Sequence, residues 1–181
     1  MQCLAIDPGI EGGAVLRDEK HGVIACYGWK KLKRKAGTII KLTAHVGNEC
    51  REYELPDDGH AQIGAILRVD VLGLTSDFVL VVEGQFVGGK NVNAGLEISF
   101  KAGLLAAGVM PHAARWWRVK PQVWRKYMYR DYSALKGRDA FKARAKQWSR
   151  DSGSQLWTLA EWHDTCEADV MSDYGLLVAG E

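Results

Sequence analysis

Apolar runs and glycine-rich breaks alternate at the start of the chain. Residues 1–16, MQCLAIDPGIEGGAVL, hold two short apolar runs separated by an acid, a proline and glycines. Short apolar runs bounded by turn residues are typical of strands. The pattern therefore predicts a buried first strand that ends at Asp7, a tight turn, and a second strand at Gly13–Arg17. A third strand is expected at His21–Trp29, so the domain opens with an antiparallel meander.

The segment Lys30–Asp58 has the weakest pattern. Its stretches Thr38–Val46 and Glu52–Leu55 fit either additional strands or loops. It begins with a basic run, KKLKRK, from Lys30 to Lys35. Such a run is either a solvated surface or a contact for nucleic acid, and the sequence leaves both open.

Helical and strand patterns follow each other in the middle of the chain. Apolar residues at helical spacing predict a helix that starts around Asp57–Gly59, with Asp58 as its cap. The continuous apolar run Phe78–Val82 predicts a strand buried on both faces, and Glu83 follows it directly. Helical spacing returns over Ala94–Ala107.

The last third of the chain is mostly helical. A short strand is expected at Ala114–Val119, and Pro121 is a favourable first residue for the next helix. A strongly basic helix is expected over Gly137–Arg150 and a final helix over Glu161–Ala179. With 181 residues the chain is long enough for one well-buried domain, and we expect a single domain over 1–181.

Two acids follow buried strands, Asp7 after the first and Glu83 after the run at 78–82. A carboxylate in such a position is costly unless a cation meets it. Two roles remain open on this ground alone: the acids hold a metal ion for chemistry, or they hold one that carries the phosphates of a nucleotide.

The final helix carries further acids. Asp169 and Asp173 are four residues apart and share a helix face, and we expect them to complete the site. Asp164 and Glu167, one turn earlier, also share a face and are the reserve pair. In a further alternative Asp169 is the last ligand, and Glu167 or Cys166 is its partner.

Charge is segregated along the chain, although the net charge is only +2. Between residues 115 and 150 there are twelve Lys or Arg and two acids, whereas no Lys or Arg follows Asp151. A basic middle segment followed by an acidic C-terminal segment indicates a polyanionic partner and a region where carboxylates bind metal. From their positions on the two helices, the expected phosphate contacts are Arg125, Lys126, Lys142 and Lys146.

The four cysteines form no Cys-x-x-Cys pair, which argues against a zinc site and fits a reducing compartment. No apolar run reaches about 18 residues, and the N-terminus lacks the pattern of a signal peptide. We therefore expect a cytoplasmic protein with no membrane contact, in the host cytoplasm if the chain is virus-encoded.

Four segments carry a resemblance to a known family. In chain order they are LAIDPGIEGGAVL, VVEGQFVGGKN, VKPQVWRK and EADVMSDYGLLVA. Together with the order of elements they resemble Holliday-junction resolvases of the RuvC type, particularly the phage-encoded branch. The resemblance covers essentially the whole chain. It implies a ribonuclease-H-like α/β fold, with a mixed five-stranded sheet that contains the meander and is flanked by helices.

The resemblance also implies an activity: a Mg²⁺-dependent endodeoxyribonuclease that resolves four-way DNA junctions by paired symmetric nicks. Two Mg²⁺ ions per site, which Mn²⁺ can replace, suit hydrolysis of a phosphodiester. By resemblance Asp7 would bridge them, with Glu83 on one side and Asp169 and Asp173 on the other. Phe86, Lys90 and Asn91 correspond to DNA-contacting positions of the second segment.

The sequence departs from the family in two places. The two helix acids are usually three residues apart, whereas Asp169 and Asp173 are four apart, and there is an extra residue between Phe86 and Lys90. Two symmetric nicks require two active sites, so a homodimer is expected, with Ala94–Ala107 as its interface.

The alternatives are a nuclease for flaps and branched DNA in general, a catalytically silent junction-binding module, and a sugar-kinase-like or actin-like fold. A sugar-kinase-like or actin-like fold would require a second phosphate-binding loop and a longer chain with two lobes.

Overall fold

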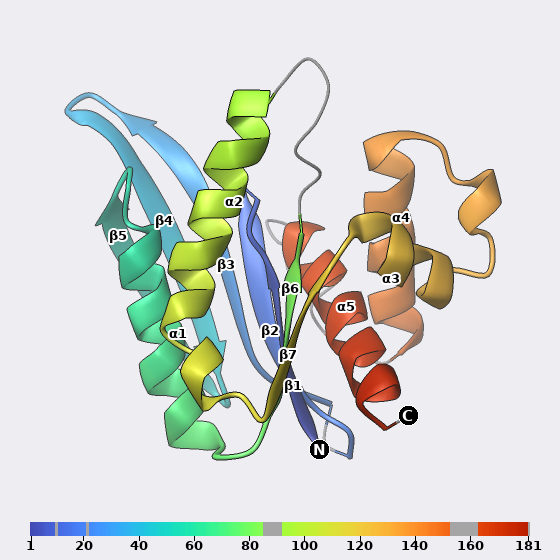
Figure 1. The fold of residues 1–181 in the computed structure, drawn as a ribbon. Coiled ribbons are helices and arrows are strands. Elements are labelled where there is room, and N and C mark those ends of the chain that lie inside the picture. Colours follow the sequence, from blue (N-terminus) through green and yellow to red (C-terminus); the bar gives the residue numbers. More distant parts are fainter. Residues whose placement is uncertain (10, 21, 85–91, 153–162, 181) are drawn as a thin grey trace.

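A seven-stranded sheet forms the centre of the computed structural model (Figure 1). The structure describes residues 1–9, 11–20, 22–84, 92–152 and 163–180, with backbone only for Val92, Ala94, His163 and Asp164. The strands lie in the order β5-β4-β3-β2-β1-β6-β7. Their bounds are β1 Gln2–Asp7, β2 Gly12–Asp18, β3 Gly22–Arg34, β4 Gly37–Val46, β5 Glu49–Pro56, β6 Val79–Glu83 and β7 Arg115–Val119.

Strand direction divides the sheet into two parts. From β1 to β5 each strand is antiparallel to its neighbour, which is the predicted meander with two further strands. On the other side β6 is parallel to β1, and β7 is parallel to β6. Because β1 and β6 are parallel neighbours, their carboxyl ends meet at the same edge of the sheet.

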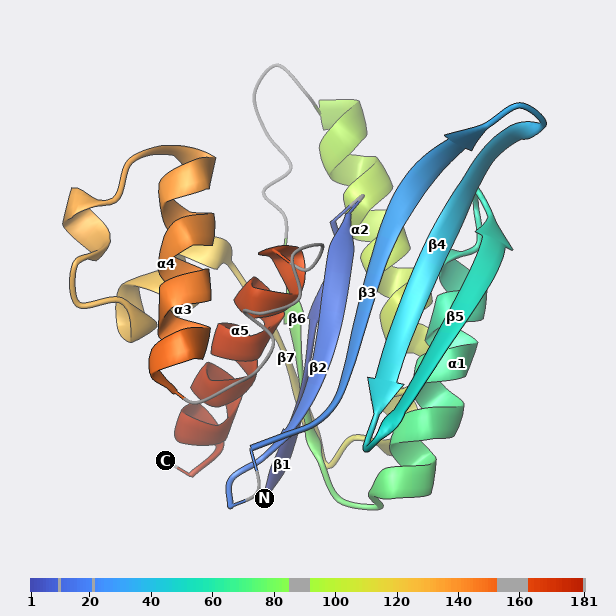
Figure 2. The same cartoon turned by 180° about the vertical axis from the view of Figure 1, so that it is seen from behind.

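Helices cover both faces of the sheet (Figures 1 and 2). On one face lie α1 and α2, and on the other lie α3, α4 and α5. The bounds are α1 His60–Leu74, α2 Val92–Ala107, α3 Pro121–Met128, α4 Gly137–Asp151 and α5 His163–Ala179, with short 3₁₀ turns at Met110–His112 and Tyr132–Ala134.

The alternation of side chains along β1 separates two apolar cores. Leu4 and Ile6 join the core beneath α1 and α2, whereas Cys3 and Ala5 join the core beneath α5. By the same alternation Asp7 belongs to the face that α5 covers. In β6, Val79 and Val81 lie on that face too, so Glu83 does as well.

The predicted elements are confirmed at most positions, with two corrections. The expectation of five strands is wrong, because Thr38–Val46 and Glu52–Leu55 belong to β4 and β5, which add two strands to the sheet. Asp58 is not the cap of α1, because Gly59 occupies the capping position and no side chain caps the helix. None of the described helices has the length and apolar character to cross a membrane.

Candidate active site

Asp7 and Glu83 lie side by side at the carboxyl ends of β1 and β6. The parallel register pairs Ile6 with Val82, so one further residue along each strand brings Asp7 beside Glu83. Neighbouring strands are about 4.8 Å apart. Both side chains are nearly buried, with 7% and 4% of their surface exposed. The structure thus brings these two acids together at one edge of the sheet, and their role as metal ligands stays a prediction.

A tight turn positions Asp7. Its Oδ1 accepts a hydrogen bond from the backbone N–H of Gly9 at 3.2 Å, and the indole N–H of Trp29 donates to the carbonyl of Gly9 at 3.1 Å. A Cβ on Gly12 would lie 2.4 Å from the backbone oxygen of Asp7 and 2.7 Å from the Trp29 ring. Glycine at position 12 is therefore what lets the turn close against Asp7.

Trp124 of α3 holds Glu83. Its indole N–H donates to Oε2 of Glu83 at 3.0 Å, and the Trp124 side chain is completely buried. The helix begins at Pro121, as predicted, directly after β7. The bond therefore fixes the carboxylate at the end of β6 from the neighbouring helix.

Helix α5 crosses the sheet with its N-terminal end near Asp7. Gly13 faces Asp7 in the β1–β2 pairing, and a Cβ on Gly13 would lie 2.9 Å from Cα of Thr165. Further along α5, a Cβ on Gly175 would lie 2.4 Å from Sγ of Cys3, near the start of β1. The first turns of α5 thus lie at the edge that carries Asp7 and Glu83, and its later turns lie toward the other edge.

Glu167, in the second turn of α5, points to α3. It forms an ion pair with Arg125, whose guanidinium lies 5.0 Å from the ring centre of Trp124 and 4.9 Å from that of Phe141. Glu83 and Glu167 therefore contact two consecutive residues of one helix, and the second is nearly buried at 5% exposure. Asp164 precedes Glu167 by three residues and shares its helix face.

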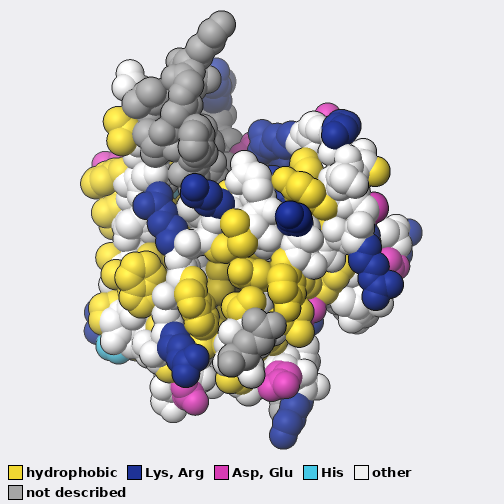
Figure 3. All heavy atoms as spheres, turned by 45° about the vertical axis from the view of Figure 1, so that its right-hand side comes forward, with side chains coloured by type: hydrophobic (Ala, Val, Ile, Leu, Met, Phe, Trp, Pro, Cys, Tyr) yellow, Lys and Arg dark blue, Asp and Glu magenta, His cyan; other side chains and the backbone are white. Residues whose placement is uncertain are grey.

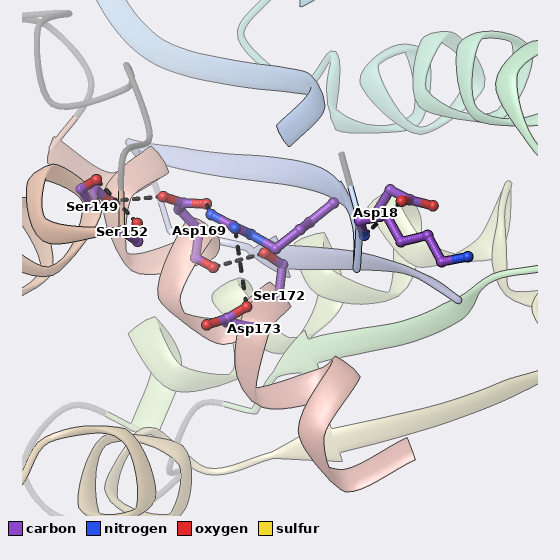
Figure 4. Close-up of polar contacts among 8 residues, drawn as sticks. Asp18, Ser149, Ser152, Asp169, Ser172 and Asp173 are labelled. Carbon is purple, nitrogen blue, oxygen red and sulfur yellow. Dashed lines mark hydrogen bonds and ion pairs between the residues drawn. The ribbon is translucent and has the colours of Figure 1, made fainter. Parts of the chain in front are cut away.

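Asp169 and Asp173 lie in a different environment, around Arg17 of β2. Figure 4 labels the two aspartates on α5 and Ser149 beside Asp169. Asp169 is completely buried, pairs with Arg17 through Oδ1, and accepts a hydrogen bond from the hydroxyl of Ser149 on α4 at Oδ2, 2.8 Å away. Asp173 lies 4.0 Å from the same guanidinium. Arg17 faces Cys3 in the sheet, four residues along β1 from Asp7.

The four acids expected at one site fall into two groups. Asp7 and Glu83 lie at the same strand ends, whereas both oxygens of Asp169 are engaged within the protein. A metal-binding role for Asp169 and Asp173 stays a prediction. Burial raises the pKa of Asp173, while the nearby Arg17 opposes that rise. The reserve pair, Asp164 and Glu167, belongs to the first two turns of α5, at the helix end nearer Asp7.

The donors at this edge suit a hard divalent cation. Asp7, Glu83 and Glu167 supply only carboxylate oxygens, which Mg²⁺ prefers. Cys166, an alternative ligand in the sequence, is buried, and burial raises the pKa of its thiol to about 11, so it is a poor partner for Mg²⁺. Among the described side chains, which do not include that of Asp164, no three acidic, histidine or cysteine groups are arranged to hold a metal ion.

The predicted DNA contacts divide into three groups. Phe86, Lys90 and Asn91 lie outside the described residues. Arg125 is engaged with Glu167, and 19% of its side chain is exposed. Lys126 is exposed on α3, whereas Lys142 and Lys146 are half-buried on α4. Their contact with DNA stays a prediction.

Sequence reasoning missed Arg17, Ser149 and Trp124 as partners of the acids. The strand pattern could have pointed to Arg17, because this residue shares a strand face with Val15 and therefore places a cation in a core. Ser149 and Trp124 had no such signal, since a serine or tryptophan at helical spacing is compatible with many surroundings.

Comparison with known proteins gives a likeness in structure alone. No protein-family model matches the chain, and no curated protein matches it. A structure of RuvC from Thermus thermophilus is similar over 99% of this chain and 97% of its own, with 11% identity and a TM-score of 0.48. A second, RuvC from the same organism in complex with a Holliday junction substrate, covers 99% and 96% with 14% identity and the same TM-score. The chemistry of the site therefore rests on the side chains of this chain.

Proposed function

We propose that the chain is a divalent-metal-dependent endonuclease that cuts branched DNA, with the four-way junction as its substrate. The observation that carries the proposal is the pair Asp7 and Glu83 at adjacent parallel strand ends. Glu167 of α5 contacts Arg125, the residue that follows Trp124, the partner of Glu83. Acids held at one edge of a sheet beside a basic helical segment suit the hydrolysis of a phosphodiester.

The proposed metal ligands are Asp7, Glu83, Glu167 and Asp164. Two Mg²⁺ ions bound there would neutralise the scissile phosphate, make a water nucleophilic and stabilise the leaving oxygen. The protein holds Asp7 by the Gly9 amide and Glu83 by the Trp124 indole, so neither carboxylate has to be ordered when metal arrives.

Helices α3 and α4 are the proposed surface for the phosphate backbone. Both are rich in Lys and Arg, and α3 directly adjoins Glu83 and Glu167. Lysines that reach phosphates release counterions, so affinity should fall steeply with salt. The choice of a four-way junction rests on the sequence motifs that resemble the RuvC type.

A homodimer is part of the proposal, because two symmetric nicks need two sites. Helix α2 presents Leu96 and Phe100 one turn apart, with 54% and 68% of their surface exposed. Beyond it, Trp116 of β7 and Val123 of α3 are 53% and 51% exposed. Figure 3 shows apolar side chains gathered in the middle of one face of the molecule. Exposed apolar area of this kind is typical of an interface.

The experiment is cleavage of a mobile four-way junction beside duplex, flap and single-stranded DNA, with Mg²⁺ present and the cut positions mapped. Asp7→Asn should keep junction affinity and lose cutting. Paired, religatable nicks confined to the junction support the proposal. Equal cutting of flaps would identify a general branched-DNA nuclease, and binding without cutting by the wild-type protein would identify a junction-binding module.

A further inference from the structure

The β3–β4 hairpin extends well beyond the edge of the sheet that carries the acids. Gly28 of β3 lies level with Asp7, because Gly13 pairs with both residues. Pairing with β4 continues six residues further, to Arg34 opposite Gly37. At about 3.3 Å per residue the hairpin therefore reaches about 20 Å past Asp7. Figures 1 and 2 show it as an arm that curves away from the helices.

The charge of this arm is of one sign. No Asp or Glu occurs between Gly22 and Val46, whereas the run from Lys30 to Lys35 holds five cations. Three basic side chains of the hairpin are paired with acids of β5 or of the segment after it: Lys31 with Asp57, Arg34 with Glu54, and Lys41 with Glu52.

The tip is different from the base of the arm. Lys33 and Lys35 are exposed, and no ion pair or side-chain hydrogen bond engages either of them within the described part of the chain. The acids of β5 and of the segment after it thus neutralise Lys31, Arg34 and Lys41, whereas Lys33 and Lys35, on either side of Arg34, keep their charge. Two unneutralised cations on a protruding arm repel each other, so the arrangement favours an anionic partner.

We propose that the tip of the β3–β4 hairpin, through Lys33 and Lys35, binds the phosphate backbone of a DNA duplex arm at a distance from the cutting site. The inference rests on the proposed nuclease function and adds a second contact to it. A duplex is the occupant that fits, because a reach of about 20 Å corresponds to about six base pairs at 3.4 Å each. A duplex arm that leaves the strand ends at Asp7 and Glu83 can therefore extend to the tip.

The contact predicts a particular salt dependence. Each phosphate contact contributes about 0.9 to the slope of log affinity against log salt concentration. The double variant Lys33→Gln/Lys35→Gln should therefore lower the magnitude of that slope by about 1 to 2 when binding to a long-armed four-way junction is measured. The matched control is Lys20→Gln/Arg68→Gln, which removes the same charge from exposed positions on the β2–β3 turn and on α1.

Arm length provides the second readout. For the wild-type protein, affinity should rise as the paired arms are lengthened from about 6 to about 20 base pairs, and the double variant should gain much less. Short arms are closed by loops so that they remain paired. Thermal melts of both variants should match the wild-type melt, since the substituted side chains are exposed.

The outcomes separate the two proposals. If the double variant and the control show the same slope and the same gain with arm length, the hairpin contact is refuted, while the nuclease proposal stands as long as the wild-type protein nicks junctions. If the wild-type protein binds no DNA in a salt-dependent manner, both fail. If the tip variant loses affinity for anionic vesicles but not for DNA, the arm is a membrane contact and the inference is wrong.

Discussion

Arg17 on β2 and Asp169 on α5 form a buried ion pair that joins the sheet to its last helix. Ser149 of α4 completes the arrangement by donating to the second oxygen of Asp169, so one carboxylate connects three elements. An acid satisfied in this way stabilises the interface between α5 and the sheet.

Removing one partner of this pair should destabilise the fold. Asp169→Leu or Arg17→Met removes one partner of this buried pair, and we expect the free energy of unfolding to fall by about 3–5 kcal/mol. The double variant Arg17→Met/Asp169→Leu removes both charges and should recover most of the loss. Urea unfolding of the three variants measures this cycle. Additive losses in the double variant would contradict a direct coupling.

Variants of the acids of α5 should differ in their nuclease activity. Glu167→Gln should lower junction nicking by at least about 100-fold, because a metal ligand is replaced by a neutral amide, whereas Asp173→Asn should retain activity within about 10-fold. Both rates are compared at saturating Mg²⁺, with melting temperatures as the control for folding. Loss of nicking in a well-folded Asp173→Asn variant would instead restore the pairing of Asp169 with Asp173 as ligands.

Arg125 should compete with metal for Glu167. In Arg125→Gln the carboxylate loses its cation, so we expect a lower melting temperature without metal and a larger rise on adding Mg²⁺ than in the wild-type protein. Thermal unfolding over a Mg²⁺ series measures both effects. The control is Lys126→Gln, the exposed neighbour on the same helix. Equal Mg²⁺-dependent shifts in the wild-type, Arg125→Gln and Lys126→Gln proteins would show that Arg125 and metal do not share Glu167.

His60, the first residue of α1, should make stability depend on pH. Burial lowers its pKa from 6.5 to about 4, and the nearby Lys101 and Lys31 add to the effect. The folded state keeps this histidine neutral, so the unfolded state binds the extra proton between these two values. Stability should therefore be complete above pH 6.5 and fall toward pH 4, by up to about 3 kcal/mol from this group.

The variant His60→Leu tests this directly. Its urea-unfolding midpoint should change less between pH 6.5 and 4 than that of the wild-type protein. An identical pH dependence in both proteins would rule out His60 as its source.

Phe100 should contribute to the proposed dimer. Phe100→Glu places a charge on the exposed face of α2, and at an interface such a change costs about 2 kcal/mol or more, or about 30-fold in Kd. Light-scattering mass against concentration, with and without junction, measures it. The control is Val69→Glu, which alters an equally exposed apolar residue, 72% exposed, on α1. A wild-type protein that is monomeric under both conditions would exclude the dimer.

Much of the fold could be predicted because periodicity is a local property. The run Phe78–Val82 and the glycines after Asp7 indicate strands and a turn without any tertiary information. The strands β4 and β5 were ambiguous for a physical reason. In β5 half-buried and exposed residues alternate and none is buried, because the strand lies at the edge of the sheet, and so its apolar signal is weak.

The site was predictable only in part. Asp7 and Glu83 follow buried strands, so their position at a sheet edge can be inferred from the sequence. The choice among the acids of α5 cannot, because it depends on which turn of the helix crosses the strand ends. That is decided by Gly13 against Thr165 and by Arg17 reaching Asp169, both contacts between segments more than 150 residues apart.

Two glycines lie where α5 packs on the sheet, Gly13 in β2 and Gly175 in α5 itself. Gly13 meets Thr165 near the end of β1 that carries Asp7, Gly175 meets Cys3 near its other end, and neither has room for even a methyl group. A helix seated at two such points cannot slide along its axis or roll without a clash at one of them. The position of the Glu167 carboxylate relative to the strand ends thus depends on the absence of side chains at Gly13 and Gly175, which take no part in chemistry. We expect alanine at either position to shift the helix and misalign the site, although every acid remains in the sequence.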